Sequence, residues 1–159
     1  MPLREWICDR KLAAVPLRAV WPTANKALYV PFRIGKPVLV KKLFLINGAT
    51  VSGNVDVGIY DAAGTRLISA GSTAQVGANA LQQFDIADTL LGWGLFYMAL
   101  AVSNVTATVF ATATLVFSEL HHLGMGMQTS ALPLPATFTL AIPADAYLPL
   151  FGLAGRVTL

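Results

Sequence analysis

The side chains that could carry nucleophilic or metal chemistry are few in this chain. Cys8 is its only cysteine, and His121 and His122 are its only histidines. No Gly-x-Ser-x-Gly motif occurs and no histidine lies near Cys8 in the sequence, so we predict no catalytic nucleophile. In an extended segment the rings of His121 and His122 point in opposite directions and cannot share one ion. A metal on a symmetry axis, with one histidine per subunit, is the alternative; we predict no metal and no cofactor.

Carboxylates offer a second kind of chemistry. Asp56, Asp61, Asp85 and Asp88 recur near the ends of predicted strands. A glycosidase needs two carboxylates roughly 5–10 Å apart on either side of a sugar, and folding could bring two of these together. Aspartates at turns and strand ends are nevertheless ordinary. We therefore predict no catalytic residue and expect that the protein is not an enzyme.

The composition predicts that other chains cover much of the surface. Only 12% of the residues are charged, 55% are hydrophobic and the mean hydropathy is +0.63, whereas roughly 25% of an ordinary soluble domain is charged. Such a chain either enters a membrane or contacts neighbouring subunits. The longest uncharged run, residues 89–118, is nearly all apolar only at residues 90–102, which is shorter than the about 20 residues of a spanning helix. We expect neighbouring subunits and no membrane.

Residues 53–71 carry the clearest local pattern, and we predict a β-hairpin there. Apolar and polar side chains alternate from Val55 to Tyr60, and residues 61–64 supply a short turn that ends in glycine. Gly58 lies inside the first strand, where a glycine usually marks a bulge or the close approach of another backbone. The hairpin indicates an antiparallel β protein.

Short strands are predicted along the rest of the chain, at residues 27–33, 38–47, 81–86, 95–102, 105–117 and 136–142. Pro31 favours an edge position for the first of them, and the pattern around Lys41 and Lys42 predicts a bulge. The strand at 95–102 should be central and covered on both faces, because one face carries small residues. Together these patterns predict an all-β fold, an antiparallel β-sandwich of jelly-roll type at residues 26–159 with an irregular apolar C-terminal tail.

Residues 1–25 are predicted to form an extended N-terminal arm, because they contain three prolines and no sustained period. Residues 1–42 hold nine basic and two acidic side chains, whereas the residues after them hold two basic and six acidic ones. The arm could pack on its own sandwich, or it could clasp a neighbouring subunit. Nucleic acid is a third partner for basic and aromatic residues, but the arm is as hydrophobic as it is basic, and we rank protein contact first. The predicted partner-binding residues are Trp6, Arg10, Lys11, Arg18 and Trp21.

Three stretches of the chain share a pattern with a known class of proteins. They are Ala27-Leu-Tyr-Val-Pro-Phe-Arg, Asn47-Gly-Ala-Thr-Val-Ser-Gly-Asn-Val-Asp-Val-Gly-Ile-Tyr-Asp-Ala-Ala-Gly-Thr-Arg-Leu and Leu95-Phe-Tyr-Met-Ala-Leu-Ala. This pattern resembles small β-sandwich proteins encoded in the structural gene regions of tailed bacteriophages. The likeness covers about residues 25–102, with a weaker echo at residues 146–153. The arm before residue 25 has no counterpart in it.

The resemblance implies a virion structural protein, with capsid decoration or cementing ahead of a head-fibre or tail accessory role. It implies a place in the virion after assembly in the host cytoplasm, a homotrimer, and major capsid or tail proteins as partners. The Tyr60-Asp-x-x-Gly64 hairpin also resembles carbohydrate-binding sandwiches. The alternative function is therefore a tail-associated module that binds a host glycan or receptor.

Overall fold

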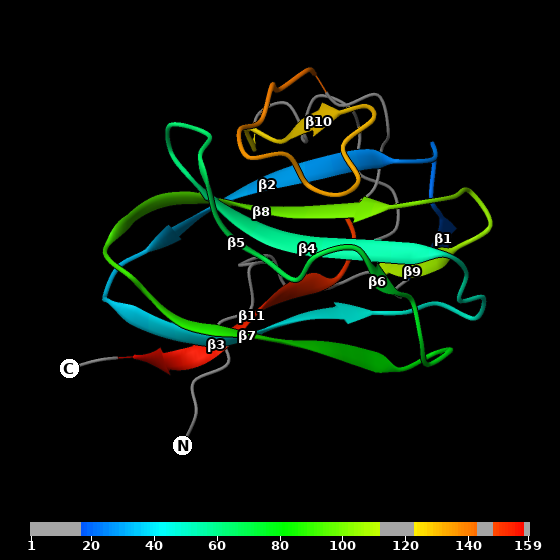
Figure 1. Ribbon diagram of the computed structural model, residues 1–159, viewed down its shortest axis with the longest axis horizontal. Coiled ribbons are helices and arrows are strands. Elements are labelled where there is room, and N and C mark those ends of the chain that lie inside the picture. Colours follow the sequence, from blue (N-terminus) through cyan, green and yellow to red (C-terminus); the bar gives the residue numbers. More distant parts are fainter. Residues whose placement is uncertain (1–16, 112–122, 143–147, 158–159) are drawn as a thin grey trace.

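The computed structural model describes residues 17–111, 123–142 and 148–157, in which antiparallel sheets pack against one another (Figure 1). The described residues form no helix, so the predicted all-β, antiparallel sandwich is confirmed. The jelly-roll connectivity stays a prediction. The strands are β1 (Leu17–Val20), β2 (Lys26–Ile34), β3 (Val38–Ile46), β4 (Asn54–Asp61), β5 (Arg66–Ser69), β6 (Thr73–Ala74), β7 (Leu81–Leu91), β8 (Gly94–Val102), β9 (Thr108–Ala111), β10 (Gly126–Gln128) and β11 (Phe151–Val157).

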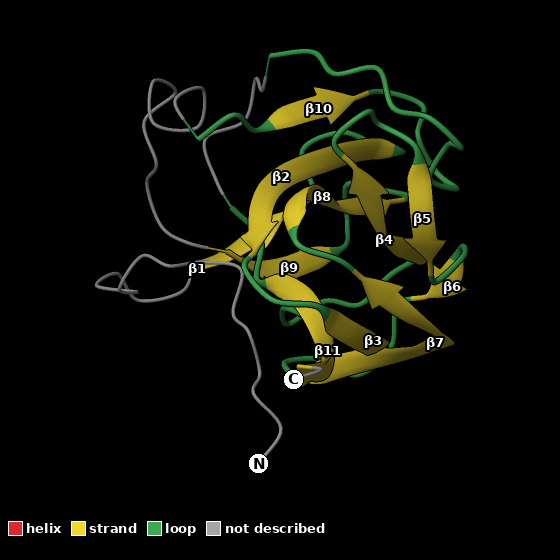
Figure 2. Cartoon of the chain, turned by 90° about the vertical axis from the view of Figure 1, so that its left-hand side faces the viewer, coloured by secondary structure: helices red, strands yellow, loops and turns green. Residues whose placement is uncertain are grey.

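Two sheets make the layers of the sandwich. The larger sheet has the order β10-β2-β8-β4-β5, with β6 also paired to β4, and the smaller sheet has the order β11-β3-β7. A separate pair, β1-β9, is linked to the end of β3 by the isolated bridge between Asn47 and Val109. Figure 2 shows the larger sheet above the smaller one when the molecule is viewed from its end.

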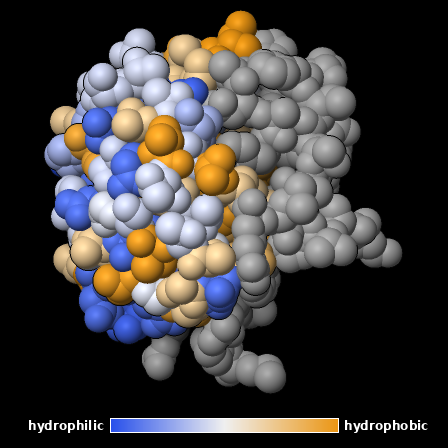
Figure 3. Space-filling model, turned by 90° about the vertical axis from the view of Figure 1, so that its right-hand side faces the viewer, coloured by the Kyte–Doolittle hydropathy of each residue, from blue (hydrophilic) through white to orange (hydrophobic). Residues whose placement is uncertain are grey.

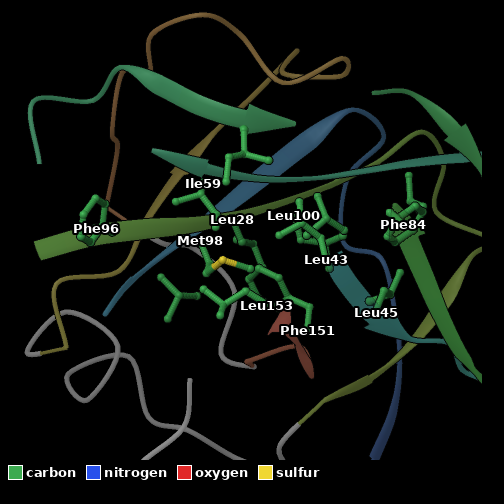
Figure 4. Close-up of a cluster of buried hydrophobic side chains, with 14 of the residues drawn as sticks. Leu28, Leu43, Leu45, Ile59, Phe84, Phe96, Met98, Leu100, Phe151 and Leu153 are labelled. Atoms are coloured by element: carbon green, nitrogen blue, oxygen red, sulfur yellow. The ribbon is translucent and has the colours of Figure 1, made fainter. Parts of the chain in front are cut away.

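The hydrophobic core lies between the two sheets. Every second residue of the long strands points inward, as period-two alternation requires. Figure 4 shows these side chains pointing toward one another from both layers. The larger sheet contributes Leu28, Ile59, Phe96, Met98 and Leu100, and the smaller sheet contributes Leu43, Leu45, Phe84, Phe151 and Leu153.

The predicted hairpin is present as β4 and β5. Its turn is closed by a hydrogen bond from the Asp61 backbone N–H to the Thr65 carbonyl oxygen at 2.9 Å, and Gly64 has the left-handed φ of 88° that favours glycine. At Gly58 a Cβ would lie 2.7 Å from Leu134 Cδ1 and 2.8 Å from the Ile68 carbonyl oxygen. The predicted close approach of another backbone at Gly58 is therefore confirmed.

Two bends lie next to each other at one end of the sandwich, where strands cross from one sheet to the other. Residues 35–37 join β2 to β3, and residues 92–93 join β7 to β8. The residue pairs on either side of the bends are in register, Ile34 with Gly94 and Val38 with Leu91. Both bends lie at the left of Figure 1.

The bulge predicted near Lys41 is confirmed, whereas the edge position predicted for the strand with Pro31 is not, because β2 lies between β10 and β8. The register of β3 against β7 shifts between Val40 and Lys42, and the register against β11 also skips Lys41, so this strand carries a bulge. Pro31 has only β8 as a neighbour, because β10 pairs with β2 only from Ala27 to Tyr29. Proline has no N–H to donate, and this unpaired part of β2 does not require one.

The C-terminal third departs from the prediction. Residues 136–142 do not form a strand; only isolated bridges occur there, Thr65 with Thr137 and Met127 with Ala141. The alternating apolar residues of this segment serve side-chain packing instead. The tail, predicted to be irregular, contains β11, which pairs with β3 throughout its length. The predicted strand at residues 105–117 is observed as Thr108–Ala111, and residues 112–117 lie outside the described residues.

Candidate functional site

Two of the five predicted partner-binding residues, Arg18 and Trp21, lie in the described part of the chain. Arg18 belongs to β1, where its backbone is in register with Phe110 of β9. Four residues of the predicted arm therefore form a paired strand, and an unpaired arm can extend at most to residue 16. Three further predicted residues lie outside the described part of the chain: Trp6, Arg10 and Lys11.

Trp21 is buried in the core of its own domain. Its side chain is 0% exposed, and its indole Nε1–H donates a hydrogen bond to the Lys26 carbonyl oxygen at 3.1 Å. Its backbone N–H donates to the Ala107 carbonyl oxygen at 2.9 Å. Trp21 is thus not free to anchor a partner, and its prediction as a partner-binding residue is wrong. The alternative, in which this part of the chain packs on its own sandwich, holds for Trp21.

Three of the four aspartates considered for catalysis make local structural contacts. Asp85 pairs with Lys42 at 2.8 Å, and Asp88 pairs with Lys41 at 2.6 Å. The Asp61 carboxylate accepts the Thr65 backbone N–H at 2.8 Å inside the hairpin turn. Cys8, His121 and His122 lie outside the described residues. Within the described ranges, no group of three or more potential metal ligands occurs.

Asp56 differs from the other aspartates because it is completely buried. Its carboxylate accepts hydrogen bonds from Ser69 Oγ at 2.9 and 3.0 Å and from the Leu134 backbone N–H at 3.0 Å. Burial raises the pKa of Asp56 above its ordinary value, although these hydrogen bonds and the nearby Arg66 guanidinium oppose the rise. Asp56 thereby attaches the segment around Leu134 to the outer face of the larger sheet.

An aromatic cluster completes the cover over this face. Phe138 lies with its ring centroid 5.1 Å from those of Tyr29 and Tyr97 and 5.4 Å from that of Tyr60. The Tyr60 hydroxyl donates to the Pro135 carbonyl oxygen at 2.6 Å. Burial raises the pKa of Tyr29 to about 12, so this hydroxyl is neutral at ordinary pH. Figure 1 shows the segment after β10 above the larger sheet, so this face is covered by the chain itself.

We expect the substitution Asp56→Asn to change how stability depends on pH. The pKa of Asp56 is higher in the folded than in the unfolded chain. At a pH between these two pKa values the folded state therefore binds more protons than the unfolded state. The free energy of unfolding consequently falls as the pH rises from the unfolded-state pKa to the folded-state pKa. Asparagine does not titrate, and it can accept the Leu134 N–H while donating to Ser69 Oγ. Denaturant unfolding of both proteins between pH 3 and about 8 should show the variant gaining on the wild type as pH rises. A constant difference would contradict the assignment.

Large exposed hydrophobic side chains mark candidate contact surfaces. Trp93, in the bend between β7 and β8, is the most exposed of them at 81%, and Leu90 nearby is 60% exposed. The others in the described residues are Val20, Leu67, Val76, Leu81, Val105, Leu123, Leu140 and Ile142. Trp93 is therefore a candidate contact residue, because its large aromatic ring is almost fully exposed.

We use the name bend surface for Arg33, Lys36 and Trp93. Arg33 and Lys36 are exposed and form no ion pair with any other described residue. Arg33 pairs in register with Leu95, two residues after Trp93, and Lys36 lies in the neighbouring bend. An exposed indole and two exposed cations thus lie on neighbouring bends whose segments are nearly 60 residues apart in the sequence.

The opposite end of the sandwich has a different surface. It carries the loops that follow β6 and β8, in which Val76 and Val105 are exposed. Figure 3 views the molecule from this end and shows hydrophobic residues in small groups among hydrophilic ones. Under these loops, the amides of Asn47, Gln75 and Gln82 form a buried hydrogen-bond network.

Comparison with protein families, curated proteins and solved structures found no match for this chain. Within the described residues, no helix has the length and hydropathy needed to cross a bilayer.

Proposed function

We propose that this protein is a non-enzymatic structural protein of a bacteriophage virion and that it decorates the capsid through protein–protein contacts. The observation that carries the proposal is where the three phage-like stretches lie. They belong to β2, to the β4–β5 hairpin and to β8, which are neighbours in the larger sheet in the order β2-β8-β4-β5. Stretches far apart in the sequence thus form one continuous structural unit, which is the part of the fold that the resemblance concerns.

The contacts of the polar residues also support a structural role. The carboxylates of Asp61, Asp85 and Asp88 close a turn or pair with lysines of the adjacent strand, and Asp56 attaches a covering segment. The bend surface combines an exposed tryptophan with an arginine, and these residue types often dominate the energy of protein interfaces.

The proposal predicts a fixed copy number on purified virions. Quantitative mass spectrometry of particles purified on a density gradient should find this chain in a constant ratio to the major capsid protein across preparations. The reason is that a decoration protein occupies symmetry-related positions on the shell. Absence from the particles, or a ratio that falls with each purification step, would contradict the proposal.

In this proposal the working form is a homotrimer, and residues 1–16 help to hold it on its neighbours through Trp6, Arg10 and Lys11. Deleting residues 1–16 tests the arm, because the deletion stops before β1 and leaves Trp21 in place. We expect the truncated protein to keep its β-rich circular dichroism spectrum and its melting temperature but to load poorly onto particles. Full loading of the truncated protein would show that the arm is not needed.

A host-attachment module is the second candidate, and the exposed indole of Trp93 favours it because an aromatic face can stack on a sugar ring. A glycan array distinguishes the two functions. Saturable binding of a host-envelope glycan by the wild type, lost in Trp93→Ala, would support the attachment function. An array without binding would exclude the glycans displayed on it.

A further inference from the structure

The bend surface gathers its side chains by strand pairing. Ile34 is in register with Gly94, so Arg33 and Trp93 flank the same rung of the β2–β8 ladder. Leu90 precedes the core residue Leu91 and faces outward from the smaller sheet, whereas Arg33 precedes the core residue Ile34 and faces outward from the larger one, so Leu90 is not part of this surface. Because neighbouring strands lie about 4.8 Å apart and the rise is about 3.3 Å per residue, the backbone of Arg33 lies within roughly 10 Å of that of Trp93. This spacing fits the centre of one protein interface.

Within the described part of the chain, the charge of this surface is positive and no ion pair compensates it. Residues 33–37 and 90–95, which form the two bends and their flanks, contain Arg33 and Lys36 and no acidic residue. The next carboxylate along the chain, Asp88, is already paired with Lys41 at 2.6 Å. Asp61 lies on β4, two strands from Arg33, and closes the hairpin turn. An acidic surface would therefore complement this end of the sandwich.

We propose that the bend surface is the anchor by which this protein docks on an acidic protein surface of the capsid. The Trp93 indole enters an apolar pocket of the shell protein, while Arg33 and Lys36 meet carboxylates at the rim. This inference rests on the proposed function and names the contact that the function needs. The arrangement is that of an interface with an apolar centre and a charged rim.

Other macromolecules fit this surface less well. Two cations provide few phosphate contacts, whereas proteins that bind nucleic acid through its backbone make many. A membrane surface would gain only about 1 kcal/mol from each basic residue. A pocket in a protein, in contrast, can bury the whole exposed indole. Tryptophan and arginine are also enriched among the few residues that contribute most of the binding energy of protein interfaces.

The test uses particles assembled without this chain, to which the purified full-length protein is added. We expect wild-type protein to bind them saturably in co-sedimentation and Trp93→Ala to bind at least about 30-fold more weakly, the loss typical of a central anchor. The double variant Arg33→Glu with Lys36→Glu should bind weakly and should lose most of the salt dependence of binding. Val76→Ala is the control, since Val76 is 56% exposed at the opposite end and should bind as the wild type does.

Each result separates the inference from the function on which it rests. If the wild-type protein does not bind the particles, the proposed function is wrong. If the wild type and both bend-surface variants bind equally, the function stands and the bend surface is not the anchor. Equal affinity of the wild type for vesicles of anionic phospholipid or for duplex DNA, lost in Trp93→Ala, would overturn the acidic protein partner. Melting curves of all variants should coincide, because the substituted side chains are exposed.

Discussion

The substitution Trp21→Ala is expected to lower the free energy of unfolding by about 3–5 kcal/mol, the usual cost of removing a large buried aromatic side chain. The indole is fully buried, and its Nε1–H is bonded to the Lys26 carbonyl oxygen. The variant loses the packing of the ring, leaves a cavity and leaves that carbonyl without this donor. Denaturant unfolding followed by circular dichroism measures the change.

The neighbouring residue supplies the control for Trp21. Val20 precedes it in the chain but is 59% exposed, so Val20→Ala should change stability by no more than about 0.5 kcal/mol. Trp21→Phe keeps part of the ring packing and removes the indole donor, and it should fall between the two. If Trp21→Ala were no more destabilising than Val20→Ala, the tryptophan would belong to the arm after all.

The substitution Gln82→Leu is expected to destabilise the fold by about 1–3 kcal/mol for each polar group that it leaves buried without a partner. Gln82 Oε1 accepts from Asn47 Nδ2 and from the Val76 N–H, each at 3.0 Å, and Gln82 Nε2 donates to the Ala74 carbonyl oxygen at 2.8 Å. Leucine has a similar size but can make none of these bonds. The loop after β6 should consequently loosen, and its amide protons should exchange faster with solvent.

The adjacent glutamine provides a matched control on the same strand. Gln83 points to the other face of β7 and is exposed, so Gln83→Leu should have little effect on unfolding. Both variants carry the same chemical change one residue apart. Equal effects of the two substitutions would contradict an energetic role for the buried amide network.

Several features of the fold could be predicted because their signals are local. The alternation around Val57 and the glycine at the end of the turn predicted the hairpin, and both the bulge at Lys41 and the close approach at Gly58 followed from single residues that interrupt a strand pattern. The small residues Ala99 and Ala101 correctly predicted that β8 is covered on both faces. Period two and turn chemistry require no knowledge of distant residues.

Other features could not be predicted because similar local sequence patterns occur both in paired strands and in segments that only pack on a sheet. Residues 136–142 alternate as a strand does, yet Phe138 packs on three tyrosines and the backbone joins no ladder. The tail at 151–157 has no clear alternation, yet it pairs with β3. Whether an apolar segment pairs with a strand, covers the face of a sheet or fills the core depends on which surfaces the rest of the chain leaves uncovered.

The candidate site illustrates the same division. A tryptophan between two glycines, as in Gly92-Trp93-Gly94, is a signal that could have identified Trp93 as a contact residue. Its proximity to Arg33 and Lys36 could not be predicted, because it depends on the register of β2 against β8. Conversely, Trp21 had the sequence features of an anchor and proved to be part of the core.

The sequence by itself determined that this chain forms antiparallel strands and has few charged residues, since alternation, turns and composition are properties of neighbouring residues or of simple counts. Only the tertiary structure decided that Trp21 is buried, that Leu17–Val20 form a paired strand and which face of the larger sheet is covered. The physical reason is that burial and strand pairing are long-range properties, set by which segments meet when the two sheets pack together.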